Sequence, residues 1–192
     1  MANVSEKYGL RPVRKIDGSP FINAQNRYRI ASNYGTAIFQ GDLVIAVNDG
    51  TIARHTANNA SPVIGVFNGV FYTDPTTQKP TFKNYYPGSI VASDIIANVI
   101  DDPNVVYKID SDGAFAVADI FKNFSVTNVT GNTQTGISKV QLDYSVSGTT
   151  GTFVIQAIDI SQDPDNDEAG AANGDILVRI NNHFYRQGGT GL

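Results

Sequence analysis

Apolar and polar residues alternate along the chain in short runs that are typical of β-strands. The clearest run spans residues 139–146, where Val, Leu, Tyr and Val alternate with Lys, Gln, Asp and Ser, and another covers residues 176–180. Such alternation gives a strand one buried face and one wet face. Because runs of about five residues recur at a spacing of roughly ten, we predict an all-β fold with a small barrel or sandwich body.

Turn residues between the runs predict how the strands connect. The Asn-Asp-Gly sequence at 48–50 accepts positive φ and predicts a hairpin between residues 43–47 and 51–56. A second hairpin is predicted for residues 105–109 and 114–118.

An unbroken apolar run at residues 63–72 predicts a strand in the middle of a sheet. Gly65 and Gly69 interrupt this run. Glycine inside a strand is typical of a bulge or of a close approach by another backbone. We therefore expect the centre of the sheet to lie here, with at least one irregularity.

The chain is expected to divide into three parts. Residues 1–30 form an extended N-terminal arm, residues 31–118 form the barrel or sandwich core, and residues 119–192 add a β-meander and C-terminal strands that complete the body or pack on it. The meander is predicted from three runs, at 121–129, 139–146 and 153–160.

The arm prediction depends on residues 8–30. This stretch holds eight large apolar side chains, but two prolines and a glycine exclude a helix of useful length. Residues 1–30 carry six Lys or Arg and two Asp or Glu, a net charge of +4, whereas residues 94–192 carry five and thirteen, a net charge of −8. Ordering so long a segment costs more than burial on its own domain returns. We predict that it lies on a neighbouring subunit or another protein; the alternative is an N-terminal strand in its own sheet.

Composition excludes several classes of protein. The absence of Cys excludes a disulfide framework and thiolate metal or redox chemistry. No run approaches the roughly 18 apolar residues of a membrane span, and Glu6 and Lys7 stand where a signal peptide would be apolar. Neither export nor membrane contact is expected. The net charge of −4 argues against nucleic acid as a partner; phosphate contacts by the basic arm, with Tyr8 or Tyr28 stacking on bases, are a weaker alternative.

Three carboxylates at alternate positions, Asp163, Asp165 and Asp167, resemble the start of a calcium loop. An EF-hand also needs Gly at the sixth position and a bidentate carboxylate at the twelfth, where this chain has Glu168 and Gly174. A solvated acidic loop is therefore favoured, with the three Asp side chains as weak candidates for oxygen ligands. No cofactor is expected.

Other candidate chemistry is sparse. His55 and His183 are the only histidines and belong to no metal or hydrolase motif, so no catalytic residue is predicted. Phe82, Tyr85 and Tyr86 follow a Pro- and Thr-rich loop. They are interpreted either as an exposed interface patch or as a cap on the barrel end, and exposed rings would also suit glycan stacking.

Four stretches carry a resemblance to a known family: YGLRPVRKIDGSPFINAQNRYRI, YGTAIFQGDLV, PVIGVFNGVFY and GDILVRINNHFYR. Together they resemble head decoration (cement) proteins of tailed bacteriophages. The resemblance implies a non-enzymatic protein, made in the host cytoplasm, that sits on the outer surface of the capsid in the virion. It also implies a homotrimer that binds the major capsid protein and stabilises the shell against internal DNA pressure.

The resemblance matches residues 8–30 to the capsid-gripping arm of that family. In this interpretation the capsid or subunit interface consists of Tyr8, Leu10, Arg11, Val13, Arg14, Lys15, Phe21, Arg27, Tyr28 and Arg29. Two alternatives remain open: a ring component of a phage tail or neck, and a glycan-binding module on the virion surface.

Overall fold

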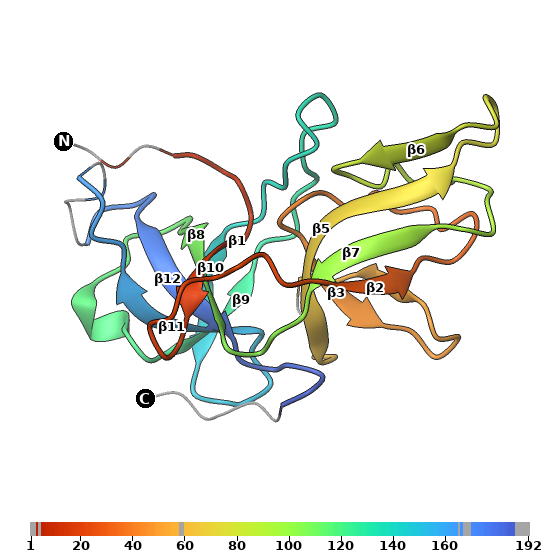
Figure 1. Cartoon of the computed structure of the whole chain (residues 1–192). Coiled ribbons are helices and arrows are strands. Elements are labelled where there is room, and N and C mark those ends of the chain that lie inside the picture. Colours follow the sequence, from red (N-terminus) through yellow and green to blue (C-terminus); the bar gives the residue numbers. More distant parts are fainter. Residues whose placement is uncertain (1–2, 4, 58–59, 165, 167–169, 187–192) are drawn as a thin grey trace.

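The chain folds into two antiparallel β-sheets that form two adjacent lobes (Figure 1). This computed structural model describes all residues except 1–2, 4, 58–59, 165, 167–169 and 187–192. Over the described ranges the single helical element is a 3-10 turn, η1 (Val117–Asp119), and no helix there is long and apolar enough to cross a lipid bilayer. The all-β prediction is confirmed. The two sheets are consistent with a sandwich, and neither closes into a barrel.

The first sheet combines one N-terminal strand with strands from the second half of the chain. All of its neighbouring strands are antiparallel. In spatial order it contains β1 (Arg11–Lys15), β8 (Val105–Asp110), β12 (Asp175–Ile180), β11 (Ile155–Ile160), β9 (Asn123–Val126) and β10 (Leu142–Gly148).

The second sheet is built around the longest strand, β5 (Val63–Thr73), as the apolar run predicted. One edge of β5 pairs with β7, and its other edge pairs first with β3 and then with β6. The remaining strands of this sheet are β2 (Asn26–Arg29), β7 (Ile96–Ile100), β3 (Leu43–Ala46), β4 (Ile52–Arg54) and β6 (Pro80–Lys83).

Each sheet has its own hydrophobic core, and the first core reaches across the junction between them. Phe115 and Phe124 pack against each other in the first core, which also includes Val66 and Ile100 from the second sheet. The second core includes Phe67, Tyr72 and Tyr86. Val66 and Ile100 hold the two lobes together, because moving the lobes apart would expose these side chains to water.

Two predictions on the second sheet are confirmed in detail. The hairpin at residues 43–56 is present as β3 and β4. Gly65 marks a close approach between backbones, since a Cβ atom there would lie 2.1 Å from the carbonyl oxygen of Ile100 on β7. A register shift between Phe67 and Val70 supplies the predicted irregularity.

The predicted meander has a different strand order. β9 lies between β10 and β11, so the strand expected in the middle is at the edge. All four residues of β9 are buried, whereas Ser145 and Ser147 of β10 are exposed. Burial of all four residues favours the central position for β9, whereas β10, with exposed polar residues, can tolerate an open edge.

The second predicted hairpin also needs correction. Residues 114–118 do not pair with β8, which instead lies between β1 and β12. β12 offers an alternating strand with five register partners for β8, while Phe115 turns into the first core. The sheets therefore divide residues 31–118 near residue 100, and residues 1–30 contribute a strand to each sheet.

Candidate protein-binding surface

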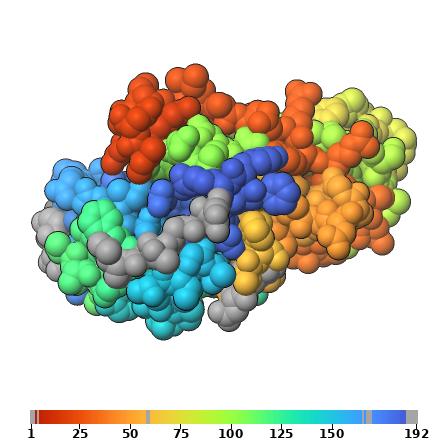
Figure 2. Space-filling model, turned by 90° about the horizontal axis from the view of Figure 1, so that it is seen from below, coloured from red at the N-terminus to blue at the C-terminus, as the bar shows by residue number. Residues whose placement is uncertain are grey.

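The N-terminal segment crosses the molecule and joins its two sheets. We call residues 8–30 the strap. Its first strand, β1, pairs with β8 at one edge of the first sheet, and its second strand, β2, pairs with β7 at one edge of the second. Since β7 leads directly into β8, the strap runs antiparallel to one continuous stretch of chain (Figure 1). Figure 2 shows this red to orange segment lying along one side of the molecule.

The start of the strap is buried in the protein's own fold. Leu10 is 1% exposed in the first core, and its backbone N–H donates to the carbonyl oxygen of Gly41 over 3.0 Å. Tyr8 is also buried, and its hydroxyl donates to Asp175 over 2.5 Å. The alternative of a strand in its own sheet is thus what the structure shows. Tyr8 and Leu10, predicted as interface anchors, are therefore buried parts of the fold and not side chains on its outer surface.

An acidic turn between β7 and β8 holds the middle and end of the strap. Lys15 forms an ion pair with Asp102 over 2.9 Å, and this hydrogen-bonded contact raises the pKa of Lys15. Asp101 accepts hydrogen bonds from the amide of Asn26 and from the hydroxyl of Tyr28, over 2.9 and 2.5 Å. Part of the opposite charge on arm and body is therefore satisfied within the chain.

Replacing Tyr28 with Phe should lower the free energy of unfolding by about 1 to 2 kcal/mol. The change removes the hydroxyl that contacts Asp101 and Tyr185, over 2.5 and 2.9 Å, but keeps the ring against the second core. Urea unfolding would measure the difference. Tyr85→Phe is the matched control, because the Tyr85 hydroxyl makes no hydrogen bond to a described residue; an equal loss in both variants would contradict the anchoring role.

The outer side of the strap exposes a mixed set of basic and apolar side chains. Ile22 is 79% exposed, and Val13 and Ile16 are 46% and 44% exposed. Arg11 lies over the Tyr8 ring at 4.1 Å from its centroid. We call the following side chains the strap surface: Arg11, Val13, Arg14, Ile16, Ile22, Arg27 and Arg29. None of its four arginines forms an ion pair with a described residue.

The remaining predicted interface residues turn inward. Phe21 is half-buried against the first core, and Tyr28 is half-buried against the second. Of the predicted interface set, the structure leaves accessible mainly the arginines and Val13. Ile16 and Ile22 were missed, although their position beside the Asp-Gly turn at 17–18 was a signal that they flank an exposed loop.

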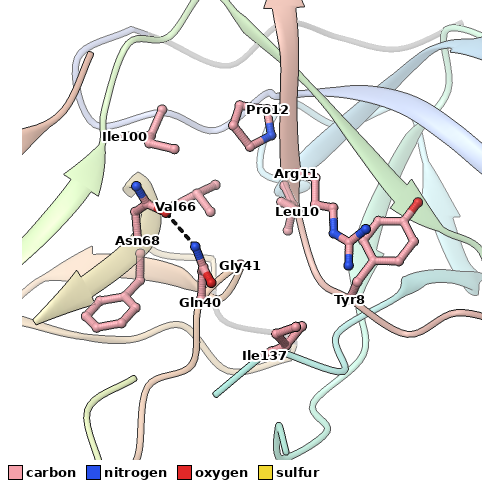
Figure 3. Close-up of a pocket in the computed structure, with 11 residues that line it drawn as sticks. Tyr8, Leu10, Arg11, Pro12, Gln40, Gly41, Val66, Asn68, Ile100 and Ile137 are labelled. Carbon is pink, nitrogen blue, oxygen red and sulfur yellow. Dashed lines mark hydrogen bonds between the residues drawn. The ribbon is translucent and has the colours of Figure 1, made fainter. Parts of the chain in front are cut away.

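A pocket of about 360 Å³ lies beside the strap where the two sheets meet (Figure 3). Leu10, Val66 and Ile100 form apolar walls, and Arg11 stands at its side. On the opposite side Gln40 donates to Asn68 over 2.9 Å. An apolar body with a few oriented polar groups is the usual chemistry of a pocket that receives one anchoring side chain.

The predicted aromatic patch does not form. Phe82 is 62% exposed, but Tyr86 is fully buried and donates its hydroxyl to the carbonyl oxygen of Tyr34 over 2.9 Å. Tyr85 stacks on Phe39 with ring centroids 5.4 Å apart. Tyr86 belongs to the second core and Tyr85 is half-buried against Phe39, so neither ring contributes to an exposed patch; the capping alternative does not apply as stated, because neither sheet closes into a barrel.

The candidate cation loop is only partly described. Asp163 binds Lys108 over 3.0 Å, and this contact lowers the pKa of Asp163. Asp165 and Asp167 lie outside the described residues. Among the residues that the structure does describe, no three His, Asp or Glu side chains are grouped as metal ligands. His55 and His183 are both buried.

Comparisons with known proteins do not identify a family for this chain. No protein-family model matches it, and neither a curated protein nor a solved structure shows significant similarity to it.

Proposed function

We propose that this chain is a non-enzymatic decoration protein of a tailed-phage head, which binds the outside of the major capsid protein shell and stabilises it, as a homotrimer. The resemblance of four sequence stretches supports this proposal. The observation that carries it is the strap surface, where exposed aliphatic and basic side chains share one segment along both sheets.

The contact in this proposal is a rigid surface and not a free arm. The strap is already ordered by its two strand pairings and by the acidic turn at Asp101 and Asp102. A partner would therefore not have to offset the entropy of ordering two dozen residues. Ile22 and Val13 would supply buried contacts, and the pocket beside Arg11 would receive an apolar side chain from the capsid.

The charge of the strap surface selects the partner. Four arginines without an ion partner among the described residues suit carboxylates on a capsid subunit, and bidentate Arg–carboxylate pairs add orientation as well as attraction. Three such surfaces on one trimer would act together. The effective concentration of the second and third contacts then makes a modest single contact long-lived.

Co-sedimentation with emptied, expanded phage heads tests the proposal. We expect binding at low salt that weakens as salt screens the arginines. Arg29→Glu and Ile22→Asp should each weaken binding by about tenfold or more, equivalent to about 1.4 kcal/mol. Both side chains are exposed, so the variants should fold normally.

Matched controls lie away from the strap. Lys79→Glu reverses an exposed charge, and Val91→Asp introduces an acid at a position that is 62% exposed. Both should bind heads as the unchanged protein does. The proposal would be overturned if heads do not bind the protein, or if they bind the strap variants and the control variants equally. Sedimentation equilibrium would test the trimer separately.

A further inference from the structure

The solvent face of the second sheet carries a row of apolar side chains where polar ones would be expected. Register pairing places Arg29, Ile96, Phe71 and Phe82 directly opposite one another on β2, β7, β5 and β6. Phe71 is 42% and Phe82 is 62% exposed. The neighbouring residues of β5 point into the core and are fully buried, so this row is on the wet face. Two exposed rings side by side are typical of a binding surface.

The ring of Phe82 lies along the sheet instead of standing away from it. A Cβ atom on Gly69 would lie only 2.9 Å from the ring Cζ atom of Phe82. The ring therefore crosses the strand at the glycine, which has a φ of +133° and no side chain to lift it. Together with Phe71, it forms a low apolar platform with one ring face open to solvent.

Polar groups of both kinds surround this platform. A cleft of about 400 Å³ is lined by the two rings, Ile96 and three polar residues, Arg27, Asp94 and Asn98. Thr73 donates to the Asp94 carboxylate from its hydroxyl over 2.7 Å and from its backbone N–H over 3.1 Å. These hydrogen bonds lower the pKa of Asp94 and fix its position. The rim of the cleft thus presents the fixed carboxylate of Asp94, the exposed guanidinium of Arg27 and the side-chain amide of Asn98.

We infer that this cleft binds a neutral oligosaccharide. A sugar ring has an apolar C–H face that stacks on an aromatic ring, and its hydroxyl groups both donate and accept hydrogen bonds. Asp94 accepts from such hydroxyls, Arg27 donates to them, and Asn98 does both. An apolar partner fits less well, because it would remove the Arg27 guanidinium from water without giving it a hydrogen-bond acceptor.

Isothermal titration calorimetry with maltohexaose, cellohexaose, laminarihexaose and tetra-N-acetylchitotetraose tests this inference. We expect at least one of these probes to bind with a dissociation constant of about 1 mM or lower. Phe82→Ala should weaken that binding about tenfold or more. Phe82→Leu still covers Gly69 but has no aromatic face. If it loses as much affinity as Phe82→Ala does, the loss comes from the missing ring stacking and not from a disturbed sheet.

Phe184→Ala is the matched control, because Phe184 is 53% exposed and does not line the cleft. It should bind the same probe as the unchanged protein does, and circular dichroism should show that all variants are folded. Absence of saturable binding by every probe, or unchanged binding by Phe82→Ala and Phe82→Leu, would overturn the inference. Arg27 belongs to both the cleft and the strap surface, but the Phe82 variants leave the strap surface unchanged, so their effect on oligosaccharide binding is distinguishable from a failure of head binding.

Discussion

Replacing Leu10 with Ala should lower the free energy of unfolding by about 3 kcal/mol. Leu10 is 1% exposed and packs in the first core, so the change removes buried methyl groups and leaves a cavity. Its backbone is held by the bond to Gly41 and by the close approach of Gly9, where a Cβ atom would lie 2.6 Å from the Gly41 carbonyl oxygen. Neighbouring groups therefore have little freedom to collapse into the space. Urea unfolding followed by circular dichroism would measure the loss.

Ile22→Ala is the matched control for this change. Both positions carry an aliphatic side chain on the strap, but Ile22 is 79% exposed, so its truncation should change stability by less than about 0.5 kcal/mol. The two variants distinguish a strap that is part of the fold from a free arm, because in a free arm neither change would alter the free energy of unfolding.

By the same reasoning, deletion of residues 1–25 should unfold much of the first sheet, because it removes β1 and Leu10 together.

The strand content was predictable because it is a local property. Alternation at residues 176–180 and the turn at 48–50 each specify a strand or hairpin from neighbouring residues alone, and both are present in the structure. Pairing between distant segments was not specified in this way. β8 has two possible neighbours of suitable pattern, and the choice of β12 over residues 114–118 depends on the packing of the whole first core.

The strap shows why the candidate site was only partly predictable. Its charge excess and its apolar content were correctly recognised, but neither property says which side chains turn inward. That depends on two strand pairings with residues 67 to 97 positions away, and on contacts with the distant acidic pair Asp101 and Asp102. The exposed ring of Phe71 was not predicted for a related reason, since it lies within an unbroken apolar run, a pattern that predicts burial on both faces of the sheet.

Replacing Asp110 with Asn should raise the free energy of unfolding at pH 7 by about 2 kcal/mol. Asp110 is 1% exposed and faces its register partner Asp175 on β12. Burial, with a smaller effect from the charge of Asp175, raises the pKa of Asp110 from 3.8 to about 6, although Gln141 and Lys7 oppose the shift. At pH 7 the folded protein thus holds a costly buried carboxylate. Asn keeps an acceptor for the Gln141 amide, which lies 3.0 Å away.

The pH dependence of this gain follows from the sign of the shift. Between about pH 6 and pH 4 the folded protein binds a proton at Asp110 before the unfolded chain does, so the unchanged protein regains stability as the pH falls. The difference between the two proteins should therefore shrink toward zero near pH 4. Asp159→Asn is the charge-matched control from an exposed position and should change stability by less than about 0.5 kcal/mol at pH 7.

His183 has the opposite slope, and the Asp110→Asn variant should reveal it. Burial, reinforced by Arg186, lowers the pKa of His183 to about 4, despite the nearby charges of Asp101 and Asp102. From about pH 6.5 down to pH 4 the unfolded chain binds a proton that the folded protein excludes, so this histidine removes stability as the pH falls. In the unchanged protein the two slopes offset each other. Without Asp110, stability should fall as the pH is lowered over that interval, and a flat profile in the variant would contradict the lowered pKa of His183.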